Sequence, residues 1–250
     1  MNEHLIIFFG QYRNFDYIVP QLNLNGFDVI ASTWNMKYSG VKAGAAGDWR
    51  EPITETDILK YIPNAKVKLW DYEFSELAFK FRNTANMLFH FKAGLSMIDE
   101  GKMYKSITLH RFDLFSDIHK IQEMDLGDSL YCDTTGEFEG GNGSDGVLRL
   151  QDWMFFGKQH IIKRYVDSFE YDFVVSPEAH KVQGDHILNN NISRTPIVGS
   201  GINYTLCKDF TQDGYSLLFD KYNKIGFKYF DSENDSELSK QFKSDITKKW

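Results

Sequence analysis

The sequence has 250 residues, 42% of them hydrophobic and 16% aromatic, which is enough to build the core of one large α/β domain. Its formal net charge of −7 argues against a protein that binds mainly through phosphate backbones, because such proteins are normally basic. The two cysteines, Cys132 and Cys207, lie far apart without metal-ligand spacing, so we expect neither a disulfide framework nor a zinc site. No apolar run approaches the ~20 residues of a membrane span and no signal peptide is recognisable. The sequence therefore predicts a soluble, cytoplasmic protein.

The start of the chain has the pattern strand, short helix, strand. Residues 5–9 and 27–31 are apolar runs typical of strands that are buried on both faces. Residues 15–24 between them have helical spacing, although Pro20 interrupts it. This order is a βαβ unit and predicts a parallel pair of strands.

Further elements alternate with loops along the rest of the chain. We expect a loop at 41–51, a helix from Thr54 or Thr56 toward Tyr61, and a strand at 66–70. A long amphipathic helix is expected at 75–99, ended by Gly101, followed by strands at 104–109 and 128–132 and a glycine-rich loop at 134–146. Beyond this loop we expect an apolar segment at 151–157, a helix after it to about Phe169, and a helix at 178–188 after Pro177. The last ~35 residues are polar and are expected to form a short helix or a tail.

Two candidate binding segments stand at the ends of the first two strands, where open α/β sheets bind ligands. Gly10 allows a ligand to approach the backbone closely, and Gln11 is the next residue. Arg13 can bind a diphosphate through hydrogen bonds from its planar guanidinium. Trp34, after the second strand, can form the wall of a pocket. Ordinary structural roles, a glycine turn and a packed tryptophan, are the alternatives.

Arg111 and Asp113 follow the strand expected at 104–109 directly. A carboxylate at the end of a buried strand is costly unless it is paired or holds a cation. The pair therefore has the chemistry to compensate a leaving diphosphate, either through a divalent metal held by Asp113 or through the guanidinium of Arg111. The alternative is an ion pair that only ends the strand.

Two later residues complete the set of candidates. Asp152 precedes an aromatic stretch, where a carboxylate can deprotonate or orient an acceptor hydroxyl, or simply cap a helix. His186 lies in the expected helix at 178–188 and is a candidate to complete a metal site, although a lone histidine is more often a structural residue.

The order and spacing of these segments resemble bacterial and viral glycosyltransferases of the lipopolysaccharide-synthesis (WavE-like) type. The resemblance covers about residues 5–188, and no single motif in it is unique. Its elements are Gly-Gln-x-Arg from Gly10, Trp34 after the second strand, Arg-x-Asp-Leu from Arg111, Asp-x-x-Phe-Phe-Gly from Asp152, and the pair Pro177-Glu178.

The resemblance implies a GT-A-like, Rossmann-type α/β domain with a mostly parallel, twisted sheet. The single domain would span 1–250, with a nucleotide-sugar-binding half to about 115, an acceptor-side half to about 200 and a C-terminal extension. It implies a nucleoside diphosphate sugar donor, with UDP the expected nucleotide, and a divalent metal such as Mn²⁺ or Mg²⁺. Gln11 and Arg13 would lie near the nucleotide, and Asp113 would replace the last acid of the Asp-x-Asp metal motif. Arg111 stands where that motif has its first acid, which puts the metal in question.

The acceptor expected from the resemblance is a surface glycan, and the second possibility is a hydroxymethylated base in viral DNA. A nucleotidyltransferase and a catalytically inactive nucleotide-sugar-binding protein are the alternatives from other classes. We also expect the glycine-rich loop at 134–146 to form a lid over the donor.

Overall fold

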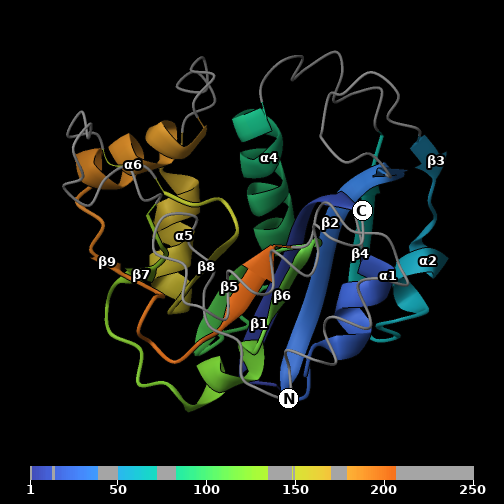
Figure 1. Cartoon of the computed structure of the whole chain (residues 1–250), viewed down its shortest axis with the longest axis horizontal. Coiled ribbons are helices and arrows are strands. Elements are labelled where there is room, and N and C mark those ends of the chain that lie inside the picture. The colour runs from blue at the N-terminus through green and yellow to red at the C-terminus, as the bar shows by residue number, and fades with distance from the viewer. Residues whose placement is uncertain are drawn as a thin grey trace, which may run out of the picture.

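A computed structural model of the chain describes residues 2–12, 15–38, 50–71, 83–134, 148, 150–169 and 179–206. It is an α/β structure, and its central sheet is mostly parallel and is flanked by helices (Figure 1). The fold class predicted from the sequence is thereby confirmed. None of the helices in these ranges is long and apolar enough to cross a membrane.

The described elements are strands, α-helices and two 3-10 helices. The strands are β1 (His4–Tyr12), β2 (Phe27–Tyr38), β3 (Arg50–Pro52), β4 (Lys66–Trp70), β5 (Ser106–Arg111), β6 (Leu114–Ser116), β7 (Leu130–Tyr131), β8 (Met154–Gly157), β9 (Arg194–Thr195) and β10 (Tyr204–Leu206). The helices are α1 (Phe15–Ile18), α2 (Glu55–Leu59), α4 (Asn83–Ser96), α5 (Gln159–Asp167) and α6 (Ala179–Asn189), with 3-10 helices η1 (Val19–Gln21) and η2 (Ile118–Glu123).

The large sheet has the strand order β3-β2-β1-β5-β8-β7-β9. The strand β4 also pairs with β2, along a different part of that strand from β3. β1 lies between β2 and β5 and is parallel to both, and the pairs β2–β4 and β7–β9 are also parallel. β3 and β8 run antiparallel to their neighbours. A separate ribbon joins β6 and β10.

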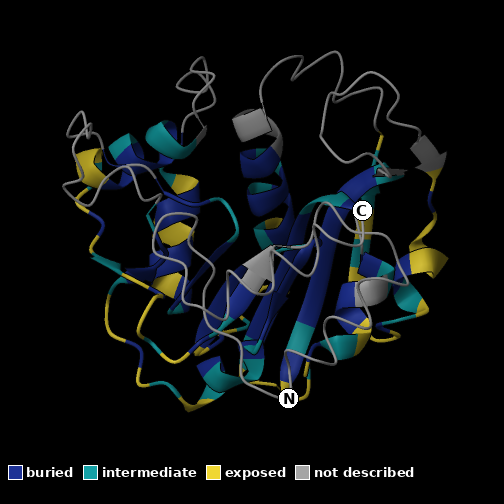
Figure 2. Cartoon of the chain, in the orientation of Figure 1, coloured by how far each residue is buried: buried dark blue, intermediate teal, exposed yellow. Residues whose placement is uncertain are grey.

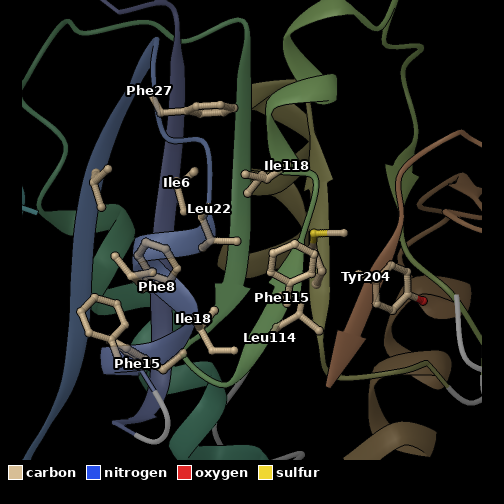
Figure 3. Packing of buried hydrophobic residues seen from close by; sticks show 14 of the residues in the cluster. Ile6, Phe8, Phe15, Ile18, Leu22, Phe27, Leu114, Phe115, Ile118 and Tyr204 are labelled. Atoms are coloured by element: carbon tan, nitrogen blue, oxygen red, sulfur yellow. The ribbon is translucent and has the colours of Figure 1, made fainter. Parts of the chain in front are cut away.

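The two faces of the sheet bury separate hydrophobic clusters, because side chains alternate along each strand. Even-numbered residues of β1, such as Phe8, pack with α1, η2 and the β6–β10 ribbon, and Figure 3 shows part of this cluster. Odd-numbered residues, such as Phe9, pack against α4, α5 and α6 on the opposite face. The central strands β1, β5 and β8 are consequently almost entirely buried (Figure 2).

Local sequence signals account for several element boundaries. The helix expected after Thr54 is α2, and the Asp57 carboxylate accepts hydrogen bonds from the Thr54 amide at 2.7 Å and from its hydroxyl at 2.9 Å. Pro20 ends α1 early, and η1 follows it. The long helix predicted to end at Gly101 instead stops at Ser96, because residues 97–100 form turns ahead of Gly101, whose φ is +76°.

Several short strands were not expected from the sequence, among them β3, β9 and β10. β3 begins inside the loop predicted at 41–51, most of which lies outside the described residues. β9 and β10 are only two and three residues long, too short to show a periodic pattern. The C-terminal chain up to Leu206 therefore contributes to the sheet and to the ribbon.

Candidate functional site

The carboxyl ends of β1 and β5 meet at a topological switch point of the sheet. The chain leaves β1 toward β2 on one side, whereas β5 is added on the other side. In open α/β sheets, ligands bind in the crevice at such a point. Phe9 is the register partner of Arg111, so Gly10 and Gln11 lie in the last part of β1, next to the point where Arg111 ends β5.

Gly10 gives this edge an open, irregular backbone. Its φ is +93°, which favours glycine, and a Cβ built on it would meet no atom within 4 Å. Its carbonyl oxygen accepts a hydrogen bond from Thr33 Oγ1 at 2.6 Å, and the register shifts between Gly10 and Tyr12. The strand end is thus anchored on one side and accessible on the other.

Arg111 and Asp113 form a bidentate ion pair. Arg111 Nε donates to Asp113 Oδ1 at 2.8 Å, and Nη2 donates to Oδ2 at 2.9 Å. The Asp113 side chain is 3% exposed and that of Arg111 is 18% exposed. Burial alone disfavours a charged guanidinium, but Asp113 and Asp152 outweigh it and raise the pKa of Arg111.

Asp152 is the second carboxylate on the same guanidinium. Arg111 Nη1 donates to Asp152 Oδ1 at 3.1 Å, and the Asp152 side chain is 27% exposed. It reaches the site because β8 is antiparallel to β5, so that the chain entering β8 lies beside the end of β5. Arg111 therefore contacts both other candidates directly, Asp113 of its own motif and Asp152 from 41 residues further along the chain.

The backbone of Arg111 is held from two sides. Its amide donates to the Trp153 carbonyl oxygen at 3.2 Å. Its carbonyl oxygen lies 2.7 Å from Nδ1 of His110, whose Nε2 lies 2.9 Å from Ser116 Oγ. The sequence did not single out His110 or Ser116, because their contact forms only when β5 and β6 fold against each other.

Trp34 lies inside the protein rather than on a pocket wall. It is 2% exposed, its ring stacks on Phe89 with centroids 5.5 Å apart, and it meets His90 edge-on at 4.5 Å. The arrangement is that of a core residue between β2 and α4, which is the structural alternative given above.

His186 also occupies a packed position. Its ring stacks on Phe169, and its Nε2 lies 3.0 Å from the Tyr165 carbonyl oxygen and 2.9 Å from Ser168 Oγ. Burial lowers its pKa. α6 belongs to the layer packed on the odd-numbered face of β1, and the His186 ring contacts α5 and the turn after it, with Asn190 Nδ2 3.3 Å from its Nδ1.

The side chains described here do not fit a divalent metal. Asp113 uses both oxygens for Arg111, and the described residues contain no group of three histidine, cysteine, aspartate or glutamate side chains that could hold a metal ion. The metal site expected at Asp113 and His186 therefore lacks a suitable donor set within this part of the chain.

Several expectations fall outside the described residues. These are Arg13, the pair Pro177-Glu178, and the glycine-rich segment beyond Thr134. Thr134 itself forms a bridge with Leu150 at the base of that segment.

Tyr204 is a neighbour of the site that the sequence did not reveal. Its hydroxyl donates to the buried carboxylate of Asp133, and its ring meets Trp153 edge-on with centroids 5.7 Å apart. The backbone amides of Ile197 and Val198 donate to the same Asp133 carboxylate, at 2.6 and 2.9 Å. These contacts fasten the chain after β9 next to Trp153, and no local sequence motif announces them.

Comparison with known proteins gives a likeness of fold. No protein-family model matches the sequence, and no curated protein matches it. Among solved structures, the chain is similar to the galactosyltransferase LgtC in complex with donor and acceptor sugar analogues, at 12% identity over 77% of this chain and 72% of that one, with a TM-score of 0.43. It is also similar to mouse xyloside xylosyltransferase 1, at 10% identity over 94% and 99% of the two chains with a TM-score of 0.40. A third similar structure is the inositol-1-phosphate CTP transferase from T. maritima, at 9% identity over 86% and 94% with a TM-score of 0.44. Identity this low concerns the fold alone, so the function has to be argued from the residues of this chain.

Proposed function

We propose that the chain transfers a sugar from a nucleoside diphosphate sugar, with UDP the expected nucleotide, to a hydroxyl group of an acceptor. The observation that supports this most is the Arg111 guanidinium between two carboxylates, at the switch point where an α/β sheet binds its ligand. A fixed cation can stabilise the leaving diphosphate of a glycosyl transfer, and a partly exposed carboxylate can deprotonate or orient the acceptor hydroxyl.

Arg111 is proposed to stabilise the departing diphosphate. Three of its five N–H donors are used by Asp113 and Asp152, which leaves one on Nη1 and one on Nη2 for a ligand. Because Asp113 fixes the guanidinium plane in advance, no reorganisation is needed when charge develops on the leaving group. Since the described residues do not fit a metal, we assign the charge compensation to Arg111 and derive no step from a cation.

Asp152 is proposed to act on the acceptor. If the reaction inverts the anomeric centre, its carboxylate accepts the proton of the attacking hydroxyl, and the new glycosidic bond forms as the bond from the sugar to the diphosphate breaks. If the reaction retains the configuration, Asp152 orients the acceptor by accepting a hydrogen bond. Its partial exposure, in contrast to the burial of Asp113, suits contact with a substrate.

Gly10 and Gln11 are proposed to contact the nucleotide. The open space beside Gly10 allows the backbone to approach a phosphate or ribose, and Gln11 follows it on the same strand end. By the resemblance of the sequence, the acceptor would be a surface glycan.

Ligand-induced shifts in melting temperature test the proposal. UDP-, GDP- and CMP-sugars, nucleoside triphosphates, and duplex DNA with hydroxymethylated bases are compared with buffer, each with and without EDTA. We expect UDP or a UDP-sugar to stabilise the chain in EDTA, and Arg111→Gln to abolish the shift. A preference for triphosphates would indicate a nucleotidyltransferase. Stabilisation by a sugar nucleotide without transfer to any acceptor would indicate a binding protein.

A further inference from the structure

The side chain of His110 makes two hydrogen bonds inside the protein, immediately before the residues of the proposed site. It is fully buried on β5, beside the ring of Phe8. Nδ1 lies 2.7 Å from the Arg111 carbonyl oxygen, and Nε2 lies 2.9 Å from Ser116 Oγ on β6. The residue therefore connects the two strands on either side of the turn at Phe112 and Asp113.

The chemistry of the partners defines the protonation of the ring. A carbonyl oxygen only accepts hydrogen bonds, so Nδ1 must carry a proton that it donates to Arg111. Burial lowers the pKa of His110 to about 4, so the ring is neutral at pH 7 and Nε2 is an acceptor. Ser116 therefore donates its hydroxyl proton to Nε2, and the direction of both hydrogen bonds is fixed.

These bonds act on the peptide that joins Arg111 to the turn. The Arg111 amide is held by the Trp153 carbonyl, next to Asp152, and the Arg111 carbonyl is held by His110. A bidentate pair between residues only two apart depends on the backbone conformation at Arg111, and both of these hydrogen bonds restrain that backbone. We propose that His110 is a positioning residue, which holds the Arg111 carbonyl through Nδ1 and thereby keeps the guanidinium in register with Asp113 and Asp152.

The other end of β5, where it pairs with β1, provides a control contact. At the opposite, amino-terminal end, His4 Nδ1 lies 2.8 Å from Ser106 Oγ, so a histidine and a serine are also in contact there. This contact is remote from Arg111. If such histidine–serine pairs had only a structural role, substitutions at His4 and at His110 would affect stability but not the contact between Arg111 and Asp113.

Asparagine and glutamine separate the two hydrogen bonds of His110. The amide nitrogen of Asn sits at the distance of Nδ1 from the backbone, whereas that of Gln sits at the distance of Nε2. His110→Asn should keep the donor to Arg111, and His110→Gln should lose it. Both variants are polar and similar in size, so the comparison does not depend on a variant that fails to fold. His4→Gln is the control.

The first measurement is the NMR signal of the Arg111 Nε–H group, identified by its loss in Arg111→Lys. This signal reports the contact with Asp113 without any substrate. We expect slow exchange with water in the wild type, His110→Asn and His4→Gln, and at least tenfold faster exchange in His110→Gln. Slow exchange in His110→Gln, or equally fast exchange in His110→Asn, would overturn the positioning role.

The second measurement is sugar transfer, and its interpretation rests on the proposed function. We expect kcat to fall about 10- to 100-fold in His110→Gln, because a small misplacement of a charged group is costly, with KM changed less. His110→Asn should remain near the wild type. If the wild type transfers no sugar while the exchange pattern holds, the proposed function fails and the positioning role stands. If transfer is unaffected in His110→Gln, the positioning role fails alone.

Discussion

The guanidinium of Arg111 and the carboxylate of Asp113 share two parallel hydrogen bonds of 2.8 and 2.9 Å, although the residues are only two positions apart. Such bidentate pairs define orientation as well as charge. Because the Asp113 side chain is 3% exposed, the pair is part of the protein interior. Substitution of Asp113 should therefore affect both the stability of the fold and the proposed reaction, whereas the sequence alone indicated only an electrostatic role in the reaction.

Asp113→Asn should reduce both turnover and stability. The change keeps the shape of the side chain but removes the charge that fixes Arg111. We expect turnover to fall about 100-fold or more, the scale of losing a preorganised charge stabiliser. The free energy of unfolding should fall by about 1–3 kcal/mol, because a buried ion pair loses one charge. Steady-state kinetics and urea unfolding measure the two effects.

Asp28→Asn is the matched control for this experiment. Asp28 is paired with Lys102 and accepts a hydrogen bond from Tyr104, and it lies at the amino-terminal end of β2. Its loss should affect stability but not turnover. If Asp113→Asn behaves in the same way, Asp113 has no part in the reaction.

Asp152→Asn should bind UDP more tightly than the wild type and yet turn over more slowly. In the structure, Asp152 occupies one N–H of Arg111 and competes with an anionic ligand for it. Neutralising the carboxylate removes this competition, and we expect about a threefold to tenfold lower Kd for UDP by calorimetry, equal to about 1 kcal/mol. Turnover should fall about 100-fold if Asp152 is the base. Weaker binding of UDP would show that Asp152 assists the nucleotide instead.

Gly184→Ala should destabilise the protein, although helix propensity predicts the opposite. Alanine in a helix is favoured over glycine by about 1 kcal/mol. A Cβ at Gly184, however, would lie 1.9 Å from the Leu148 carbonyl oxygen. The Leu150 amide also donates a hydrogen bond to the His180 carbonyl oxygen of α6, at 3.0 Å, and Leu150 lies two residues before Asp152.

We expect Gly184→Ala to lower the free energy of unfolding by about 1–3 kcal/mol, the usual cost of overpacking, and to lower turnover as well. Gly127→Ala is the control, since nothing lies within 4 Å of its Cβ position. Equal stability of the two variants would contradict the close approach of α6 and Leu148.

Stability should fall as the pH drops below about 6.5, in part because of His90. Burial lowers the pKa of His90 to about 3, whereas the unfolded chain keeps the ordinary value of 6.5. Between these values the unfolded state binds a proton that the folded state does not, so unfolding becomes easier as pH falls. One such proton corresponds to about 1.4 kcal/mol per pH unit.

His90→Asn should remove this contribution while allowing a hydrogen bond to Ser32, the present partner of His90 Nδ1 at 3.0 Å. Urea unfolding between pH 4.5 and 6 measures the slope of the free energy of unfolding against pH. A slope that is unchanged in the variant would show that His90 is not held neutral by the fold.

Much of the fold could be predicted because the hydrophobic pattern is local. The runs at 5–9 and 66–70 are recognisable as strands without reference to the rest of the chain, and they correspond to β1 and β4. β9 and β10 could not be predicted in this way, since such short strands exist only through pairing with β7 and β6. Tertiary pairing, and not local propensity, forms them.

The residues of the candidate site also differ in how far the sequence could predict them. Arg111, Asp113 and Asp152 could be selected because charged residues next to buried strands are unusual. Trp34 could not be assigned from the sequence, because an aromatic residue at a strand end can line a pocket or pack in the core, and here its ring stacks on Phe89 of α4. His110 was missed because its importance depends on the direction of a turn that the sequence does not reveal.

The account depends most directly on Arg111 as the group that compensates the leaving diphosphate. The decisive measurement is UDP release from the UDP-sugar that stabilises the wild type most, in the presence of EDTA, for the wild type, Arg111→Lys and Arg111→Gln. We predict turnover in the wild type with EDTA, a partial loss in Arg111→Lys because charge remains without the planar fork, and a loss of about 100-fold or more in Arg111→Gln. Two results together would contradict this role of Arg111. The wild type would lose turnover in EDTA, and a folded Arg111→Gln variant would keep turnover when Mn²⁺ is added.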